Sequence, residues 1–259
     1  MAHLTLQQTA GMATITLNRP DRRNAFNEEV VAELTQAFTA MGQHADVRCI
    51  VLAANGPAFC AGADLNWMRR IADYSPAQNL ADAVQLAQML RVIYACPKPT
   101  VVRIQGDVYA GGIGLVAVCD VAVAVDSAYF CLSEVKLGLV PATISPYVVR
   151  AMGARAAHRY FLTAERFNAD EALRIGFVHE VVAAQALDAT VARITHALLA
   201  ASPQAVSTCK RLLHEVAQKE ITPALVALTV EAIADSRASA HGREGIQAFL
   251  EKRPPDWRL

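Results

Sequence analysis

A lone carboxylate and two small-residue loops are the groups of this chain that could do chemistry together. Glu134 stands in an otherwise apolar stretch, where burial raises the pKa of a carboxyl group toward working pH, as a general acid or base requires. Gly111 lies in a glycine cluster between a short strand and an apolar helix, and segment 59–68 is a second glycine-containing loop entering a helix. Free N–H groups at such helix starts can hold an anion or a developing oxyanion.

Each of these features also has a purely structural interpretation. Glycines between a strand and a buried helix allow close helix–sheet packing. Glu134 could form an ion pair with Lys136 or with another surface charge. Two further acids, Asp107 and Asp120, lie nearby in the sequence, and Asp120 is interpreted as the end of a helix before a strand. The residues alone leave these alternatives open.

Short strands that alternate with helices must position these groups. The strands predicted from polar–apolar alternation or from short apolar runs are 4–8, 13–17, 47–53, 100–104 and 121–125. The helices predicted from apolar residues at helical spacing are 28–41 and 77–94. The helix starts predicted after Pro141 are at Ser145, Asn168, Ser202 and Thr222. This order predicts an α/β core of ββα-type units over residues 1–200 and a C-terminal helical segment over 201–259.

Composition restricts the class of protein. Of 259 residues, 54% are hydrophobic and 19% are charged, which indicates a large interior. Lys plus Arg and Asp plus Glu both number 24, and zero net charge argues against a nucleic-acid surface and suits an oligomer. The six cysteines have no CxxC spacing and are predicted to be buried free thiols, and the histidines lack ligand spacing, so no metal site is predicted. Without a signal pattern or a membrane-spanning run, we predict a cytoplasmic protein that binds no membrane.

Several segments together resemble the enoyl-CoA hydratase/isomerase, or crotonase, superfamily. They are NRPDRRNAF (18–26), FCAGADLNWM (59–68), YAGGIGLVAVCD (109–120), SEVKLGLVP (133–141) and FLEKRPPDW (249–257). The resemblance runs essentially end to end. It implies a spiral of ββα units with a C-terminal helical trimerisation segment, and hence a homotrimer or a dimer of trimers. It also implies an acyl-CoA thioester substrate and no cofactor other than the coenzyme A of that substrate.

The resemblance assigns roles to particular residues. The N–H groups of Ala63 and Gly111 are implied to stabilise an enolate at the thioester carbonyl, which suits their places at likely helix starts. The positions implied to contact coenzyme A are Arg23, Ala25, Ala61, Asp64 and Leu65. Without the family, Arg23 would be interpreted as a solvated charge in a turn.

Only one of the two catalytic glutamates of the family's hydratases is present in this chain. These enzymes carry one glutamate three residues after the oxyanion glycine and another 20 residues further on. Glu134 matches the second (134 − 114 = 20), but position 114 is glycine. In having glycine at this position, the chain resembles bacterial methylglutaconyl-CoA hydratases of leucine breakdown and their relatives that act on isohexenylglutaconyl-CoA. Segment 142–146 replaces the family's usual glycine-rich run and is expected to change the floor of the site.

These features predict a lyase that adds water reversibly to an α,β-enoyl-CoA. Gly114 is expected to leave room for a methyl branch and to remove a charge that would repel a distal carboxylate, which predicts 3-methylglutaconyl-CoA or a related substrate. One alternative is a Δ3,Δ2-enoyl-CoA isomerase that uses a single glutamate. Another is a non-catalytic acyl-CoA-binding or RNA-binding relative, against which zero net charge and the retained Glu134 both argue.

Overall fold

The chain opens with the antiparallel hairpin that its alternating sequence predicts. In the computed structural model, which describes residues 3–257, the hairpin consists of β1 (Leu4–Thr9) and β2 (Met12–Leu17). Ala10 and Gly11 reverse the chain between the strands with φ values of 45° and 82°. The hairpin forms one edge of the larger of two sheets.

The larger sheet has the strand order β1-β2-β3-β5-β7-β10. Its remaining strands are β3 (Cys49–Ala54), β5 (Thr100–Ile104), β7 (Val121–Val125) and β10 (Glu180–Val182). Apart from the hairpin, neighbouring strands run parallel. Strand β3 is buried along its whole length, as its unbroken apolar sequence predicts for an interior parallel strand.

The smaller sheet has the order β4-β6-β8-β9. Its strands are β4 (Ala58–Cys60), β6 (Asp107–Tyr109), β8 (Tyr129–Cys131) and β9 (Phe167–Asn168). Strands β3, β5 and β7 of the larger sheet are followed in sequence by β4, β6 and β8 of the smaller sheet, and each pair is followed by a helical segment. The predicted ββα-type units are therefore confirmed.

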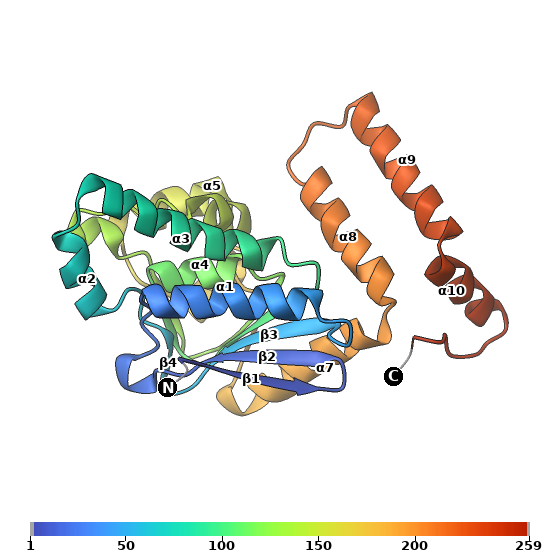
Figure 1. The fold of residues 1–259 in the computed structure, drawn as a ribbon, viewed down its shortest axis with the longest axis horizontal. Helices are drawn as coiled ribbons and strands as arrows, with labels where there is room; N and C mark the ends of the chain where they lie inside the picture. The colour runs from blue at the N-terminus through green and yellow to red at the C-terminus, as the bar shows by residue number, and fades with distance from the viewer. Residues whose placement is uncertain (1–2, 258–259) are drawn as a thin grey trace.

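Helices cover both sheets and connect their strands. The α-helices of this body are α1 (Glu28–Gln43), α2 (Leu65–Ala72), α3 (Pro76–Tyr94), α4 (Gly111–Ala117), α5 (Ser145–Thr163), α6 (Ala169–Arg174) and α7 (Leu187–Ala200). Short 3-10 helices are η1 (Pro20–Arg22), η2 (Glu134–Leu137) and η3 (Ala184–Ala186). Helices α1 and α3 pack against each other on one side of the larger sheet, as Figure 1 shows, and α7 packs on β3, β5 and β7. Helix α4 packs on α5.

Helix α5 begins differently from the prediction. Ser145 is its first residue, and the N-cap is Ile144. The Ser145 hydroxyl donates to the Ala142 carbonyl oxygen at 2.8 Å, so it holds the preceding turn and not the helix start. Gly153 has φ 78° and breaks the helix into two parts. The predicted N-caps that the structure confirms are Asn168, Ser202 and Thr222.

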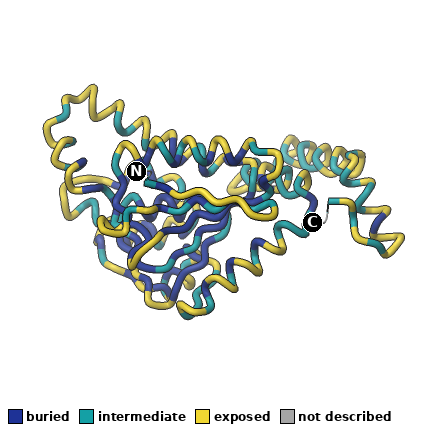
Figure 2. The backbone as a smooth tube through the Cα atoms, turned by 60° about the horizontal axis from the view of Figure 1, so that its bottom comes forward, coloured by how far each residue is buried: buried dark blue, intermediate teal, exposed yellow. Residues whose placement is uncertain are grey.

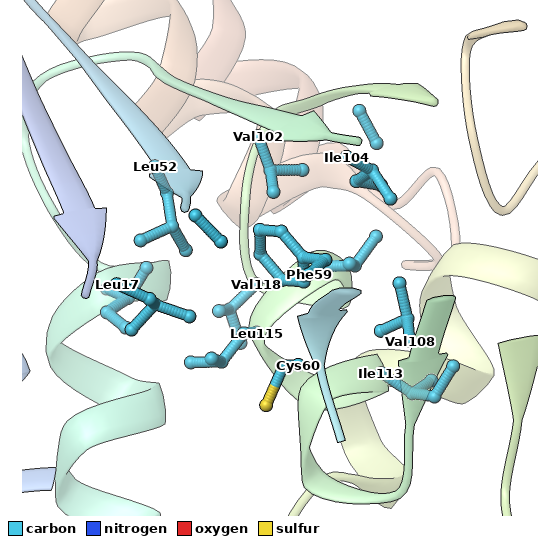
Figure 3. Packing of buried hydrophobic residues seen from close by; sticks show 14 of the residues in the cluster. Leu17, Leu52, Phe59, Cys60, Val102, Ile104, Val108, Ile113, Leu115 and Val118 are labelled. Atoms are coloured by element: carbon cyan, nitrogen blue, oxygen red, sulfur yellow. The ribbon is translucent and has the colours of Figure 1, made fainter. Parts of the chain in front are cut away.

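The apolar core lies between the two sheets and under α4. Figure 3 shows the ring of Phe59, from β4, among side chains that include Val102 of the larger sheet and Leu115 of α4. These three side chains are fully buried. Figure 2 shows the buried segments concentrated in this layer of strands. Helix α4 is therefore held by the core along its apolar sequence.

The C-terminal helices project away from the α/β body (Figure 1). They are α8 (Pro203–Val216), α9 (Pro223–Ala238) and α10 (Ala240–Leu250). Helix α9 has no buried residue in the described structure, whereas α8 is tied to the body by Lys210, whose Nζ lies 2.7 Å from Oδ2 of Asp120. A helical C-terminal segment is thus present, and its boundary at residue 200 remains a prediction. Among the described helices, none combines the length and hydropathy that a membrane span needs.

Candidate active site

A turn between β2 and α1 is locked by a buried asparagine. Asn24 is 2% exposed, and its Nδ2 donates to the carbonyl oxygens of Asn55 and Ala58 at 2.7 and 2.8 Å. Its Oδ1 accepts from the N–H of Arg19 at 2.9 Å. Arg23 and Asn24 have φ values of 50° and 54°, in the left-handed region that asparagine tolerates better than most residues. The sequence analysis did not identify Asn24, although an asparagine in this polar turn was the available signal.

This turn places Arg23 beside the end of β4. The N–H of Ala61 donates to the Arg23 carbonyl oxygen at 2.9 Å. Both residues line a pocket of about 320 Å³, together with Pro57, Ala58, Asp107 and Tyr109. The structure therefore brings together two of the positions implied to contact coenzyme A.

The other three implied contact positions have different surroundings. Asp64 is buried and caps α2, accepting from the N–H groups of Asn66 and Trp67. It also accepts from Arg19, whose Nη2 lies 2.9 Å from Oδ2. Burial alone would raise the pKa of the Asp64 carboxyl group, but these hydrogen bonds lower it below its ordinary value. Its carboxylate is therefore engaged in holding the loop.

Ala25 and Leu65 differ in exposure. Ala25 is buried, and its carbonyl oxygen accepts from the Arg19 guanidinium, so Arg19 joins the 19–25 turn to the loop that Asp64 caps. Leu65, the first residue of α2, is 70% exposed and is free to contact a ligand at the surface. The sequence analysis missed Arg19, because an ion pair across 45 positions leaves no local signal.

The predicted oxyanion donors have N–H groups without partners in the described chain. A parallel bridge joins Phe26 to this loop: its N–H donates to Gly62 O at 2.9 Å, and its carbonyl oxygen accepts from Asp64 N at 3.0 Å. The N–H of Ala63, between these two, takes no part in the bridge. Neither it nor the N–H of Gly111, the first residue of α4, has an acceptor within residues 3–257. Such groups can bind an oxyanion.

The two loops meet where glycine is required. A Cβ atom on Gly62, which has φ 87°, would lie 2.9 Å from Cβ of Ala110. A Cβ atom on Gly112 would lie 2.9 Å from Cβ of Cys60. Close packing is therefore part of the reason for the glycines, and it is the same packing that places the loop of Ala63 against the start of α4.

Glu134 is a half-buried carboxylate without a charge partner. It begins η2 after β8, and its Oε2 is buried without a hydrogen-bond partner in the described structure. Among residues 3–257 no cation lies within ion-pair distance of it, so the alternative of a pair with Lys136 is not observed. Burial raises the pKa of the Glu134 carboxyl group, against a smaller opposing effect of its own backbone N–H. This is the environment that a general acid–base carboxylate needs.

The expectation that Gly114 opens space in the site is wrong. A Cβ atom on Gly114 would lie 2.9 Å from Cβ of Ile144 and still closer to its Cγ2, and 3.4 Å from Cδ2 of Leu90. Ile144 is 1% exposed and fills the volume that a side chain at position 114 would take. The prediction treated glycine as empty space because the sequence does not say what packs against it.

Asp120 has the structural role predicted for it. Its Oδ2 accepts from the N–H of Thr100 at 2.7 Å, from the Thr100 hydroxyl at 2.9 Å and from Lys210 Nζ at 2.7 Å. These contacts join the segment after α4 to β5 and to α8.

The described residues contain no disulfide, and most of the cysteines are buried, although Cys209 is exposed. Within residues 3–257 no group of three or more His, Cys, Asp or Glu side chains could hold a metal ion.

Comparison with known proteins agrees with this fold. The family model described as enoyl-CoA hydratase/isomerase matches residues 7–259. The crystal structure of an enoyl-CoA hydratase from Shewanella pealeana is similar, with 44% identity, a TM-score of 0.96 and coverage of 98% of this chain and 96% of that one. Pseudomonas aeruginosa AtuE has 36% identity, a TM-score of 0.94 and coverage of 99% and 100%. Crotonyl-CoA hydratase from Syntrophomonas wolfei is 31% identical over 97% of this chain and 96% of its own length. This chain therefore has the crotonase fold and belongs to the enoyl-CoA hydratase/isomerase family.

Proposed function

We propose that this protein adds water reversibly across the α,β double bond of an acyl-CoA thioester, with Glu134 as its acid–base group. The observation that carries the proposal is a buried, unpartnered carboxylate oxygen on Glu134 in a chain whose Ala63 and Gly111 N–H groups have no acceptor in the described structure. Similar proteins named enoyl-CoA hydratase and crotonyl-CoA hydratase support this reaction class.

One carboxyl group can perform both proton transfers of this reaction. The N–H groups of Ala63 and Gly111 donate to the thioester carbonyl oxygen. As the water oxygen bonds to C3, its proton passes to Glu134 and the electron pair of the double bond moves to the carbonyl oxygen as an enolate. Glu134 then returns the proton to C2. Losing one oxyanion donor typically raises such a barrier by about 2.7–4 kcal/mol.

Coenzyme A is the binding group of the proposed substrate, and no resident cofactor is needed. The pocket lined by Arg23 and Ala61 suits its phosphate-bearing part, because a guanidinium can pair with phosphate oxygens. Ala25 and the exposed Leu65 flank the same turn and loop. Asp64 serves this site by capping α2 and holding the loop of Ala63.

For the acyl group we propose a chain that is branched at C3 and ends in a carboxylate, as in 3-methylglutaconyl-CoA, which would place the enzyme in leucine breakdown. The support is the absence of a carboxylate at position 114, which is Gly114 packed under Ile144. Two like charges 4 Å apart cost about 1 kcal/mol in water and about 4 kcal/mol at an effective dielectric constant of 20. A second glutamate would therefore discriminate strongly against a carboxylated chain.

A Δ3,Δ2-enoyl-CoA isomerase is the second candidate, because one carboxylate can also move a proton between two carbons. Turnover of straight, branched and carboxylated enoyl-CoAs in ¹⁸O-labelled water tests both functions. A hydratase gives a hydroxyacyl-CoA that carries the label, whereas an isomerase gives an unlabelled enoyl-CoA. Products without label from every substrate would refute the hydratase.

We also propose that the chain forms a homotrimer, or a dimer of trimers, through its C-terminal helices. The support is apolar surface on α9 and α10 that the single chain leaves open: Val230, Phe249 and Leu250 are 59%, 81% and 74% exposed. Burying apolar surface stabilises association by about 25 cal/mol per Å². Light scattering should give a trimer or a hexamer, and a monomer at micromolar concentration would contradict the proposal.

A further inference from the structure

One buried aromatic residue contacts both loops that carry the proposed oxyanion donors. Phe26 lies between η1 and α1 and is 2% exposed. Its backbone forms the parallel bridge to Ala63, with one hydrogen bond to Gly62 and another from Asp64. Its ring reaches the other donor residue, Gly111. The two contacts act on the two donors in different ways.

The backbone of Phe26 sets the direction of the Ala63 N–H. The carbonyl group of Gly62 and the N–H of Ala63 belong to one planar peptide unit, and in a trans peptide these two groups point in opposite directions. The Phe26 N–H donates to that carbonyl oxygen at 2.9 Å. The Ala63 N–H therefore points away from the backbone of Phe26, where it has no acceptor in the described structure.

The ring of Phe26 lies against the start of α4. A Cβ atom on Gly111 would lie 3.1 Å from Cε1 of Phe26 and still closer to Cζ, so the ring edge faces the Cα atom of Gly111. Trp67 packs behind this ring, with the two ring centroids 6.1 Å apart and the ring planes at 52°. Trp67 is itself 3% exposed, and its Nε1 donates to Oδ1 of Asp82 at 3.1 Å, which joins α2 to α3. The Phe26 ring is therefore held in place from behind.

The small residues of the two loops and the ring of Phe26 have opposite effects on the distance between the loops. Gly62 allows its loop to approach Ala110, because a Cβ atom there would lie only 2.9 Å from Cβ of Ala110. The ring of Phe26 limits how far the next residue, Gly111, can follow. Together they fix the separation of the two donor residues.

We propose that Phe26 is the positioning residue of the oxyanion site: its backbone directs the Ala63 N–H, and its ring sets the distance from that group to the Gly111 N–H. This inference rests on the proposed hydratase function. An oxyanion must lie about 2.7–3.1 Å from each donor to be stabilised by both. Phe26 transfers no proton itself and acts through the two donors.

Two substitutions of Phe26 and one control test this role. Phe26→Leu removes the ring edge that faces Gly111, whereas Phe26→Met keeps a large apolar side chain but makes it flexible. Phe38→Leu is the matched control, because Phe38 is 1% exposed in the same apolar core but lies within α1. All three variants and the wild type are measured by Tm and by kcat and KM for crotonyl-CoA and 3-methylglutaconyl-CoA.

An infrared difference spectrum reports on the donors directly. The ligand is butyryl-CoA labelled with ¹³C at the carbonyl carbon, a saturated thioester that cannot be hydrated. Its carbonyl band moves to lower frequency when the carbonyl oxygen accepts hydrogen bonds. A role limited to core packing would lower Tm without changing this band.

We expect both Phe26 variants to lower kcat by about 10- to 100-fold with KM changed by no more than a few-fold, because a misplacement of about 1 Å can cost about 10²-fold in rate. The carbonyl band should shift less in both variants than in the wild type. Phe38→Leu should lower Tm about as much as Phe26→Leu and leave kcat and the band unchanged.

Gly111→Ala tests the contact with the ring, because it keeps the N–H group and adds the Cβ atom. It should lower Tm by roughly 3–10 °C, since overpacking strains a core. Added to Phe26→Leu, it should lower Tm by less than half as much, because residues in contact show non-additive effects. Equal losses in the two backgrounds would overturn the assignment of the ring.

Failure of the inference and failure of the proposed function give different results. A band shift and a kcat in Phe26→Leu and Phe26→Met that equal those of the wild type would overturn the positioning role alone. The same loss of kcat in Phe38→Leu would also overturn it, because general loosening of the core would then explain the effect. Wild-type protein that neither hydrates a thioester nor shifts its carbonyl band would overturn the proposed function and this inference with it.

Discussion

Replacing Glu134 by glutamine tests whether its carboxyl group is needed for catalysis, separately from any role in stability. The exchange keeps the size of the side chain and removes its ability to ionise. General acid–base catalysis typically contributes 10²- to 10⁴-fold, so kcat for hydration should fall by about that factor, or about 2.7–5.5 kcal/mol of barrier. Binding of a CoA thioester should change by no more than a few-fold, because the proposed coenzyme A contacts lie on other elements.

The stability of this variant can be predicted from the same carboxylate. The folded protein raises the pKa of Glu134 above its value in the unfolded chain. The contribution of Glu134 to the free energy of unfolding is therefore fully present below the pKa that it has in the unfolded chain. This contribution is lost as pH rises through the pKa that it has in the folded protein. At pH 7 the ionised group disfavours folding, and its Oε2 makes no hydrogen bond in the described structure that glutamine would break. Tm of Glu134→Gln at pH 7 should equal or exceed that of the wild type, and the difference should shrink at acidic pH.

The assay measures kcat and the Kd of the thioester, together with Tm at two pH values. Glu165→Gln is a matched control, because Glu165 pairs with Arg159 on the surface and is expected to leave kcat unchanged. More than about a tenth of wild-type kcat in Glu134→Gln would refute the assignment. An equal loss of kcat in both variants would show that the assay responds to general damage.

Three further predictions concern the acid–base group, the oxyanion loop and the attachment of α8. The kcat/KM for hydration should fall as pH is lowered, with an apparent pKa above the ordinary glutamate value of about 4.3, because burial raises the pKa of Glu134. A pH–rate profile with its midpoint at or below that value would contradict this prediction. Ala63→Pro removes an unpaired N–H and should lower kcat by about 10²–10³-fold with little change in Tm, whereas Ala61→Pro removes a hydrogen bond to Arg23 and should lower Tm. Lys210→Met leaves the Asp120 carboxylate without its charge partner and should cost about 3–5 kcal/mol of unfolding free energy in denaturant titrations; a loss below about 1 kcal/mol would show that the pair is dispensable.

Local patterns in the sequence predicted five strands of the larger sheet, but none of the short strands β4, β6, β8 and β9 that form the smaller sheet. The hairpin, the buried strands and the long helices follow from periodicities that each segment carries by itself. The cap-plus-proline starts at Ser202 and Thr222 are equally local, because the cap accepts a bond from an N–H three residues away. The same rule gave a wrong prediction at Ser145, because its hydroxyl donates to a carbonyl oxygen in the preceding turn and does not cap the helix.

The contacts that hold the site could not be predicted in this way. Asn24 reaches carbonyl oxygens more than 30 positions away, and Arg19 reaches Asp64 across 45 positions. The sequence did indicate that segment 142–146 alters the site, but the direction of Ile144 depends on how α5 packs against α4. Glycine at position 114 was therefore taken for a space when it is one half of a contact.

Features that cost stability gather where these elements meet. Ala110, the N-cap of α4, has φ 49° and ψ −123°, outside the left-handed helical well, and such residues cost about 1–3 kcal/mol. The conformation is held by the bond from its N–H to Cys131 O at 2.8 Å, which also joins the start of α4 to the strand that leads into Glu134. The strained turn leaves the Gly111 N–H unpaired in the described structure, and Oε2 of Glu134 is buried there without a hydrogen-bond partner. Strain, an unpaired donor and an unpartnered carboxylate oxygen on adjoining segments are explained together by an acyl-CoA thioester whose enolate oxygen accepts from the donors and whose C2 takes a proton from the Glu134 carboxyl group.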